Sequence, residues 1–83
     1  MVKKPDSLQP PGSPQDLQPL GLTRREADVL FWLIQGKGIS DIGTLLNLSS
    51  ATVKKHLEHI FQKLGVENRT SAIISALQQL SGN

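Results

Sequence analysis

A chain of 83 residues can form one domain at most, and the core of that domain must be small. A net charge of +2 permits a nucleic-acid partner without requiring one. The absence of cysteine excludes a disulfide framework, a thiolate nucleophile and a cysteine-based zinc site. No apolar run approaches the roughly 20 residues of a transmembrane helix, so we expect a soluble, cytoplasmic protein with no membrane partner.

Residues 1–21 contain all five prolines of the chain and few apolar residues before Leu20. Each proline removes a backbone donor and disfavours the helical conformation at the residue before it. We therefore expect residues 1–21 to form a disordered, proline-rich arm. It is either a linker to another domain, which we favour, or an arm without a role.

The folded domain is expected over residues 22–80, and its first helix follows Leu22. Thr23 and Glu26 have the spacing of a capping box, in which each side chain satisfies an amide of the first turn. Leu22 precedes the cap, where an apolar residue can pack against the helix. Apolar residues then recur with helical spacing until Gly36, where we expect the helix to end.

A second, short helix is predicted over 40–46. Either Ser40 or Gly38 can serve as its N-cap. Gly43 lies inside it and costs about 1 kcal/mol relative to alanine, which suggests that another backbone approaches closely there. We expect three side chains to face inward, those of Ile42, Leu45 and Leu46.

The third helix is predicted over 49–64 and has the clearest amphipathic pattern. Ser49 is a natural N-cap, and Gly65 suits the left-handed residue that ends many helices. Sixteen residues at ~1.5 Å each give roughly 24 Å, a rod that fits a DNA major groove. Two helices joined by so short a link have the pattern of a helix-turn-helix. The apolar face consists of Val53, Leu57, Ile60, Phe61 and Leu64.

A fourth helix is predicted over 69–80, with Asn68 as its N-cap. Ile74 lies off the apolar stripe and is a candidate for subunit contact. The expected fold class is all-α, with four helices behind the arm. The inward stripe consists of Ala72, Ile73, Ala76, Leu77 and Leu80.

The sequence offers little for catalysis. His56 and His59 have a spacing that can chelate a metal, but no third ligand accompanies them. The hydroxyls near Ser49 have no histidine or carboxylate placed to activate them, and the carboxylates are scattered over different elements. We expect no enzymatic activity, no metal and no cofactor.

The start of the third helix is better suited to binding phosphate. Unpaired amides and the positive end of the helix dipole coincide there with the hydroxyls of Ser49, Ser50 and Thr52. Lys54 and Lys55 follow one turn later. Phosphate contacts position a protein on DNA, and neighbouring side chains can then reach base edges.

Residues 22–72 resemble the LuxR/GerE-type helix-turn-helix domain found at the C-terminus of NarL/FixJ response regulators and of quorum-sensing regulators. The resemblance implies a bacterial transcription regulator that binds specific double-stranded DNA sequences. It further implies that the third helix enters the major groove and that the fourth forms a homodimer contact, which suits an inverted repeat. RNA polymerase is a further possible partner. The matching residues are Leu22, Thr23, Arg25, Glu26, Val29, Leu30, Gly36, Ile42, Leu45, Leu46, Ser49, Thr52, Val53, Lys54, His56, Ile60, Lys63, Leu64, Gly65, Val66, Asn68 and Arg69.

The family pattern also implies roles for single residues. The base-facing positions are Lys54, Lys55 and Glu58, and the backbone-facing positions are Ser49 and Thr52, to which we add Ser50, Lys63 and Arg69. Ile74 and Leu77 are the candidates for the dimer contact.

The chain departs from the family pattern at Ile39, Gly43 and Glu58, where asparagine, alanine and a neutral or basic residue are usual. The first two departures predict that the second helix starts late or is less stable. Glu58 either accepts a hydrogen bond from cytosine N4 or pairs with Lys54 or Lys55.

Two other functions remain open at this point. A sigma-factor-like module that reads promoters with RNA polymerase would have similar second and third helices, although the fourth helix argues against it. A helical module that binds protein is a different class, and the small net charge permits it. DNA binding through several phosphates must weaken steeply with salt, whereas a protein contact need not.

Overall fold

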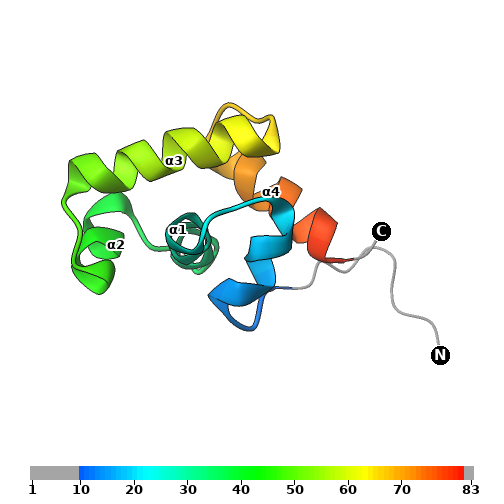
Figure 1. Ribbon diagram of the computed structural model, residues 1–83, viewed down its shortest axis with the longest axis horizontal. Helices are drawn as coiled ribbons and strands as arrows, with labels where there is room; N and C mark the ends of the chain where they lie inside the picture. The colour runs from blue at the N-terminus through cyan, green and yellow to red at the C-terminus, as the bar shows by residue number, and fades with distance from the viewer. Residues whose placement is uncertain (1–9, 82–83) are drawn as a thin grey trace.

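The computed structural model describes residues 10–81, and all regular structure in that range is helical (Figure 1). The elements in chain order are the 3-10 helix η1 (Pro14–Leu20) and the α-helices α1 (Arg24–Ile34), α2 (Ile39–Leu46), α3 (Ser50–Leu64) and α4 (Arg69–Leu80). The predicted all-α fold with four successive α-helices is confirmed.

Side-chain caps fix where three of the helices begin. The Thr23 hydroxyl accepts a hydrogen bond from the Glu26 amide at 3.2 Å, and the Thr23 amide donates to Glu26 Oε1 at 2.9 Å, which completes the predicted capping box. Ser49 caps α3, and Asn68 caps α4 by accepting from the Ser71 amide at 2.9 Å. At the other end of α3, Gly65 has a φ of 71°, the left-handed conformation that the sequence predicted.

Helix α2 begins at Ile39, one residue earlier than predicted, and Gly38 is its N-cap. The replacement of the family's asparagine by Ile39 therefore does not delay the helix. The inward orientation predicted for Leu45 is wrong, because its side chain is 48% exposed. Each residue turns an α-helix by about 100°, so a face centred on the buried Ile42 and Gly43 leaves Leu45 to one side.

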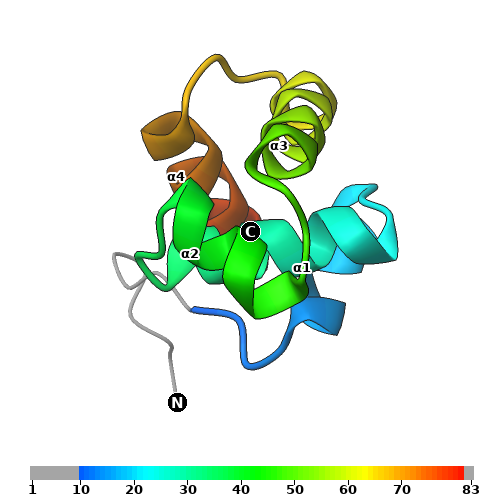
Figure 2. The same cartoon turned by 90° about the vertical axis from the view of Figure 1, so that its left-hand side faces the viewer.

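Gly43 lies at a close approach of two backbone segments. A Cβ added there would lie 2.6 Å from the carbonyl oxygen of Leu48, which no side chain tolerates. The Leu48 amide also donates to the Gly43 carbonyl at 2.8 Å. The predicted backbone approach is confirmed, and it lets the chain rise directly from the end of α2 into α3 (Figure 2).

The core forms around α1, which is seen end-on in Figure 1 with α3 across one side of it. Val29 and Leu30 of α1 are fully buried, as are Val53 and Ile60 of α3. Trp32 is half-buried, and its ring meets that of Phe31 edge-on at a centroid separation of 5.1 Å. The apolar periodicity of the sequence therefore identified the buried faces of α1 and α3.

Residues 14–20 correct the prediction of a disordered arm over 1–21. They form η1, which packs against α1 and α4. Pro14 starts this helix, a position where the missing amide is no loss, and Asp16 Oδ2 accepts from the amides of Gly12 and Ser13. Leu17 is fully buried in the common core, so this segment gains apolar contacts that its proline content obscured. Residues 1–9 of the predicted arm lie outside the described residues.

Candidate nucleic-acid interface

Helix α3 has one covered face and one open face. Its buried residues are Val53, Leu57 and Ile60, whereas Lys54, Lys55 and Glu58 are exposed. Figure 1 shows α3 along one edge of the molecule, with α1 and α2 on a single side of it. The three side chains predicted to face bases are therefore accessible together.

The charges on this open face are not used inside the domain. Among residues 10–81 the ion pairs involve Asp28 and Glu26 as the acids, and none reaches Lys54, Lys55 or Glu58. The alternative in which Glu58 pairs with a neighbouring lysine is therefore not formed. All three charged groups are free to contact a ligand.

The N-terminus of α3 holds its hydroxyls in a fixed arrangement. The Ser49 hydroxyl accepts from the Thr52 amide at 3.1 Å and donates to the Thr52 hydroxyl at 2.9 Å. This cap satisfies one amide of the first turn and leaves the amides of residues 50 and 51 without an intrahelical partner, as in any α-helix. Ser50 is exposed beside them. The structure thus gathers the three predicted hydroxyls at the positive end of the helix dipole.

Arg69 joins the open face from a different helix. It is the first residue of α4, and it lines a shallow groove together with Lys54 and Glu58. The floor of the groove is apolar and includes Leu57 and Phe61. The fold therefore brings two predicted base contacts and one predicted backbone contact to the same place.

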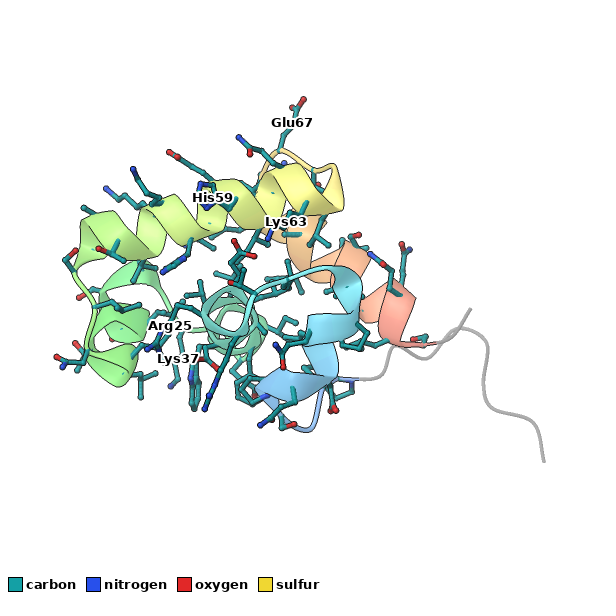
Figure 3. The ribbon with its side chains drawn as sticks, viewed as in Figure 1. Arg25, Lys37, His59, Lys63 and Glu67 are labelled. Atoms are coloured by element: carbon teal, nitrogen blue, oxygen red, sulfur yellow. The ribbon has the colours of Figure 1, made fainter. Side chains whose placement is uncertain are left out.

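Lys63 differs from the other predicted contacts, because its ammonium group is engaged within the domain. Lys63 Nζ lies 2.7 Å from Glu26 Oε1, and His59 Nδ1 lies 3.7 Å from Glu26 Oε2. Figure 3 shows Lys63 on the side of α3 that faces α1. The pair links the C-terminal end of α3 to the N-terminus of α1.

The charge state of Glu26 follows from these contacts. The carboxyl is only 4% exposed, and burial alone raises its pKa. The hydrogen bonds from Lys63 and Thr23 and the charge of Lys63 outweigh burial, so the pKa of Glu26 lies below its ordinary value. Glu26 therefore stays ionised at neutral pH, and its ion pair with Lys63 holds α3 against α1. Sequence reasoning placed Glu26 in the cap but missed this pair.

On α4 the two candidates for subunit contact differ. Ile74 is 44% exposed, as expected for a residue off the apolar stripe, and Leu77 is half-buried. An apolar residue as open as Ile74 is available to a second molecule. For other ligands, residues 10–81 contain no group of three or more side chains suited to a metal ion. Over the same range no helix is long and apolar enough to cross a membrane.

Comparison with known proteins places this arrangement in a family. Residues 20–76 match the profile of the family described as bacterial regulatory proteins, luxR family. The chain belongs to this family. The luxR-family resemblance inferred from the sequence is therefore confirmed.

Individual luxR-family relatives differ in how much of them the chain covers. It is 47% identical to the nitrate/nitrite response regulator protein NarP of Escherichia coli over 58 residues. These residues make up 70% of this chain and 27% of NarP. It is 43% identical to the transcriptional activator protein VanR of Vibrio anguillarum over 56 residues. These residues make up 68% of this chain and 23% of VanR. The chain thus spans about a quarter of these relatives. The spore germination protein GerE of Bacillus subtilis is 39% identical over 57 residues, which cover 69% of this chain and 77% of GerE.

Proposed function

We propose that this chain is the DNA-binding part of a bacterial transcription regulator, in which α3 enters the major groove of double-stranded DNA. The observation that carries the proposal is the open face of α3, where Lys54, Lys55 and Glu58 are exposed and have no ion pair among the described residues. Membership of the luxR family supports it independently. The site of action is then the bacterial cytoplasm, where the DNA is.

The proposed contacts are of two kinds, those to base edges and those to phosphates. Lys54 and Lys55 reach base edges, because they lie on the open face one turn after the helix start. Ser49, Ser50 and Thr52 seat the N-terminus of α3 on a phosphate, where the helix dipole favours an anion. Arg69 adds a second phosphate contact from α4, across the groove that it shares with Lys54. Lys63 stays a proposed backbone contact, but its ammonium group would have to exchange Glu26 for a phosphate.

We further propose that two copies bind together through α4, with Ile74 at the contact and Leu77 beside it. The exposure of Ile74 supports this role, because an apolar residue on a helix surface gains free energy when a partner covers it. Dimeric helix-turn-helix proteins read half-sites about 10 bp apart, so an inverted repeat with that spacing is expected. RNA polymerase is the further partner that a transcription activator would contact.

The test begins by selecting bound sequences from a random pool of duplex DNA, because the preferred site is unknown. Fluorescence anisotropy with the selected site then measures affinity at fixed salt. We expect Lys54→Ala and Lys55→Ala each to weaken binding by about 1–3 kcal/mol, the range for a good base contact. Lys37→Ala is the matched control, since Lys37 is exposed and lies on the side of α1 away from α3 (Figure 3).

A salt titration separates DNA binding from a protein-interaction role. If the two phosphates proposed for the N-terminus of α3 and for Arg69 are contacted, raising the salt from about 50 to about 200 mM should weaken binding roughly 12-fold. A salt-independent interaction, or unchanged affinity in both lysine variants, would contradict the proposal. If the selected DNA contains single half-sites and one chain binds each, the proposal of DNA binding would stand and the proposal of a dimer would be wrong.

A further inference from the structure

We propose that Glu58 makes this domain select a C·G base pair, with the cytosine amino group donating to the Glu58 carboxylate in the major groove. This inference rests on the proposed function and adds a base preference to it. It concerns the carboxylate of Glu58, which lies on the open face of α3 together with Lys54 and Lys55.

The position of Glu58 on α3 supports direct contact with a base. Val53, Leu57 and Ile60 define the buried side of the helix. At about 100° per residue, Lys55 lies roughly opposite the centre of that stripe, and Glu58 lies about 130° from it, on the flank where Lys54 and Arg69 line the groove. A helix that enters the major groove with its open face forward therefore brings both Lys55 and Glu58 within reach of base edges.

The charge environment of Glu58 also fits. Its carboxylate has no hydrogen-bond or ion-pair partner within residues 10–81, so no internal contact must break before it can bind. Lys54 and Arg69 line the same groove as Glu58. These two cations offset the repulsion between the carboxylate and the DNA phosphates, which would otherwise oppose its entry.

Hydrogen-bonding chemistry then decides the base. An ionised carboxylate has acceptors only, so it needs a donor on the base edge. In the major groove, cytosine offers its N4 amino group, whereas guanine and thymine offer acceptors at the corresponding positions. Adenine has an N6 donor beside the N7 acceptor, which repels the second carboxylate oxygen. Cytosine is therefore the preferred base.

Helix geometry gives the distance to the neighbouring contact. Lys54 and Glu58 are four residues apart, which corresponds to about 6 Å along α3. Base pairs are stacked at about 3.4 Å, so the two side chains contact base pairs at most about two steps apart. Lysine pairs best with the O6 and N7 acceptors of guanine. The half-site should then contain a guanine and a cytosine no more than about two base-pair steps apart.

The experiment compares base preferences of the wild-type chain and its variants by selection from a random duplex pool, followed by affinity measurements on the selected site. The wild type should enrich cytosine at one position of each half-site. Replacing that base pair should weaken binding about tenfold, equivalent to ~1.4 kcal/mol. Glu58→Gln should change the preferred base at this position from cytosine to adenine, because glutamine pairs with adenine N6 and N7.

Two further variants distinguish base recognition by Glu58 from a general effect of charge and from a loss of folding. Glu67→Gln removes the same charge from an exposed residue in the loop between α3 and α4. It should leave the cytosine preference intact, even if overall affinity rises. Glu58→Ala suits a helix and should remove the preference without creating one for adenine.

The outcomes are distinct. If the wild-type chain binds selected DNA and Glu58→Gln and Glu58→Ala keep its preference at every position, the inference is wrong and the proposed function stands. If Glu67→Gln changes the preference as Glu58→Gln does, a general charge effect replaces base readout. If the wild-type chain enriches no sequence at all, the proposed function fails together with the inference.

Discussion

Glu26 and Lys63 are the residues whose roles the structure changes most. Glu26 is the buried charged residue among those described, and Lys63 supplies its principal cation. Their positions are 37 residues apart, and a capping-box pattern indicates only the local partner of a glutamate. The cap at Thr23 could therefore be predicted from the sequence, whereas the pair with Lys63 required the packing of α3 on α1.

Lys63→Met tests this pair, because methionine keeps much of the apolar stem and removes the charge. We expect the free energy of unfolding to fall by about 1–3 kcal/mol, since the buried carboxylate loses a charge-assisted hydrogen bond. The exposure of the Lys63 side chain, 37%, argues against a larger effect. Urea denaturation followed by circular dichroism gives the measurement.

Lys37→Met is the matched control for Lys63→Met and should leave stability nearly unchanged, since Lys37 is exposed. If Lys63→Met keeps full stability but loses affinity for DNA, the main role of Lys63 would be the DNA-backbone contact predicted from the sequence, and not the pair with Glu26.

At the scale of the element, periodicity predicted the long helices well and the short ones less well. Helix α3 has three buried residues spaced along two turns, and both of its ends carry residues with specific backbone preferences. Helix α2 has only eight residues, too few for the pattern to fix its face, and Leu45 was assigned to the wrong side. Helix η1 was missed because a seven-residue segment with two prolines has no periodic signal; its order depends on docking to α1 and α4.

The docking of η1 predicts that Leu17→Ala destabilises the whole domain. Leu17 is fully buried, so truncation leaves a cavity and should lower the free energy of unfolding by about 2–5 kcal/mol. Thermal unfolding of the full chain would show this as a lower melting temperature.

The same truncation at Leu45 provides the control for Leu17→Ala, since Leu45 is 48% exposed and should lose no more than about 0.5 kcal/mol. Equal effects at the two leucines would mean that η1 does not contribute to the core.

At the scale of the whole molecule, the ion pair makes stability depend on pH. The pKa of Glu26 is lowered in the folded chain from an ordinary value of 4.5. A lowered pKa contributes stability above the unfolded-state value, and that contribution is lost as pH falls through the folded-state value. We therefore expect the free energy of unfolding to decline as the pH falls below about 4.5.

Urea denaturation over a pH series checks this expectation, with Glu26→Gln as the comparison. The variant should be less stable than the wild type at pH 7, and its stability should decline less on acidification. Parallel pH profiles for the two proteins would show that other carboxyls determine the acid sensitivity.

The sequence predicted which residues belong to the candidate site better than it predicted how they lie relative to one another. The amphipathic pattern and the family resemblance indicated the residues of α3 that lie on the open face. The groove that joins Arg69 to Lys54 and Glu58 depends on how α4 packs beside α3, and no spacing in the sequence encodes that contact. The pair between Lys63 and Glu26 has the same origin.

The edge-on contact of Trp32 with Phe31 has a practical consequence. Trp32 is the sole tryptophan of the chain and is half-buried in α1, whereas the proposed DNA contacts lie on α3 and α4. Its emission should therefore report whether the domain is folded, in a spectral channel separate from that of a dye on the DNA. Folding and binding of every variant can then be followed in one cuvette without labelling the protein.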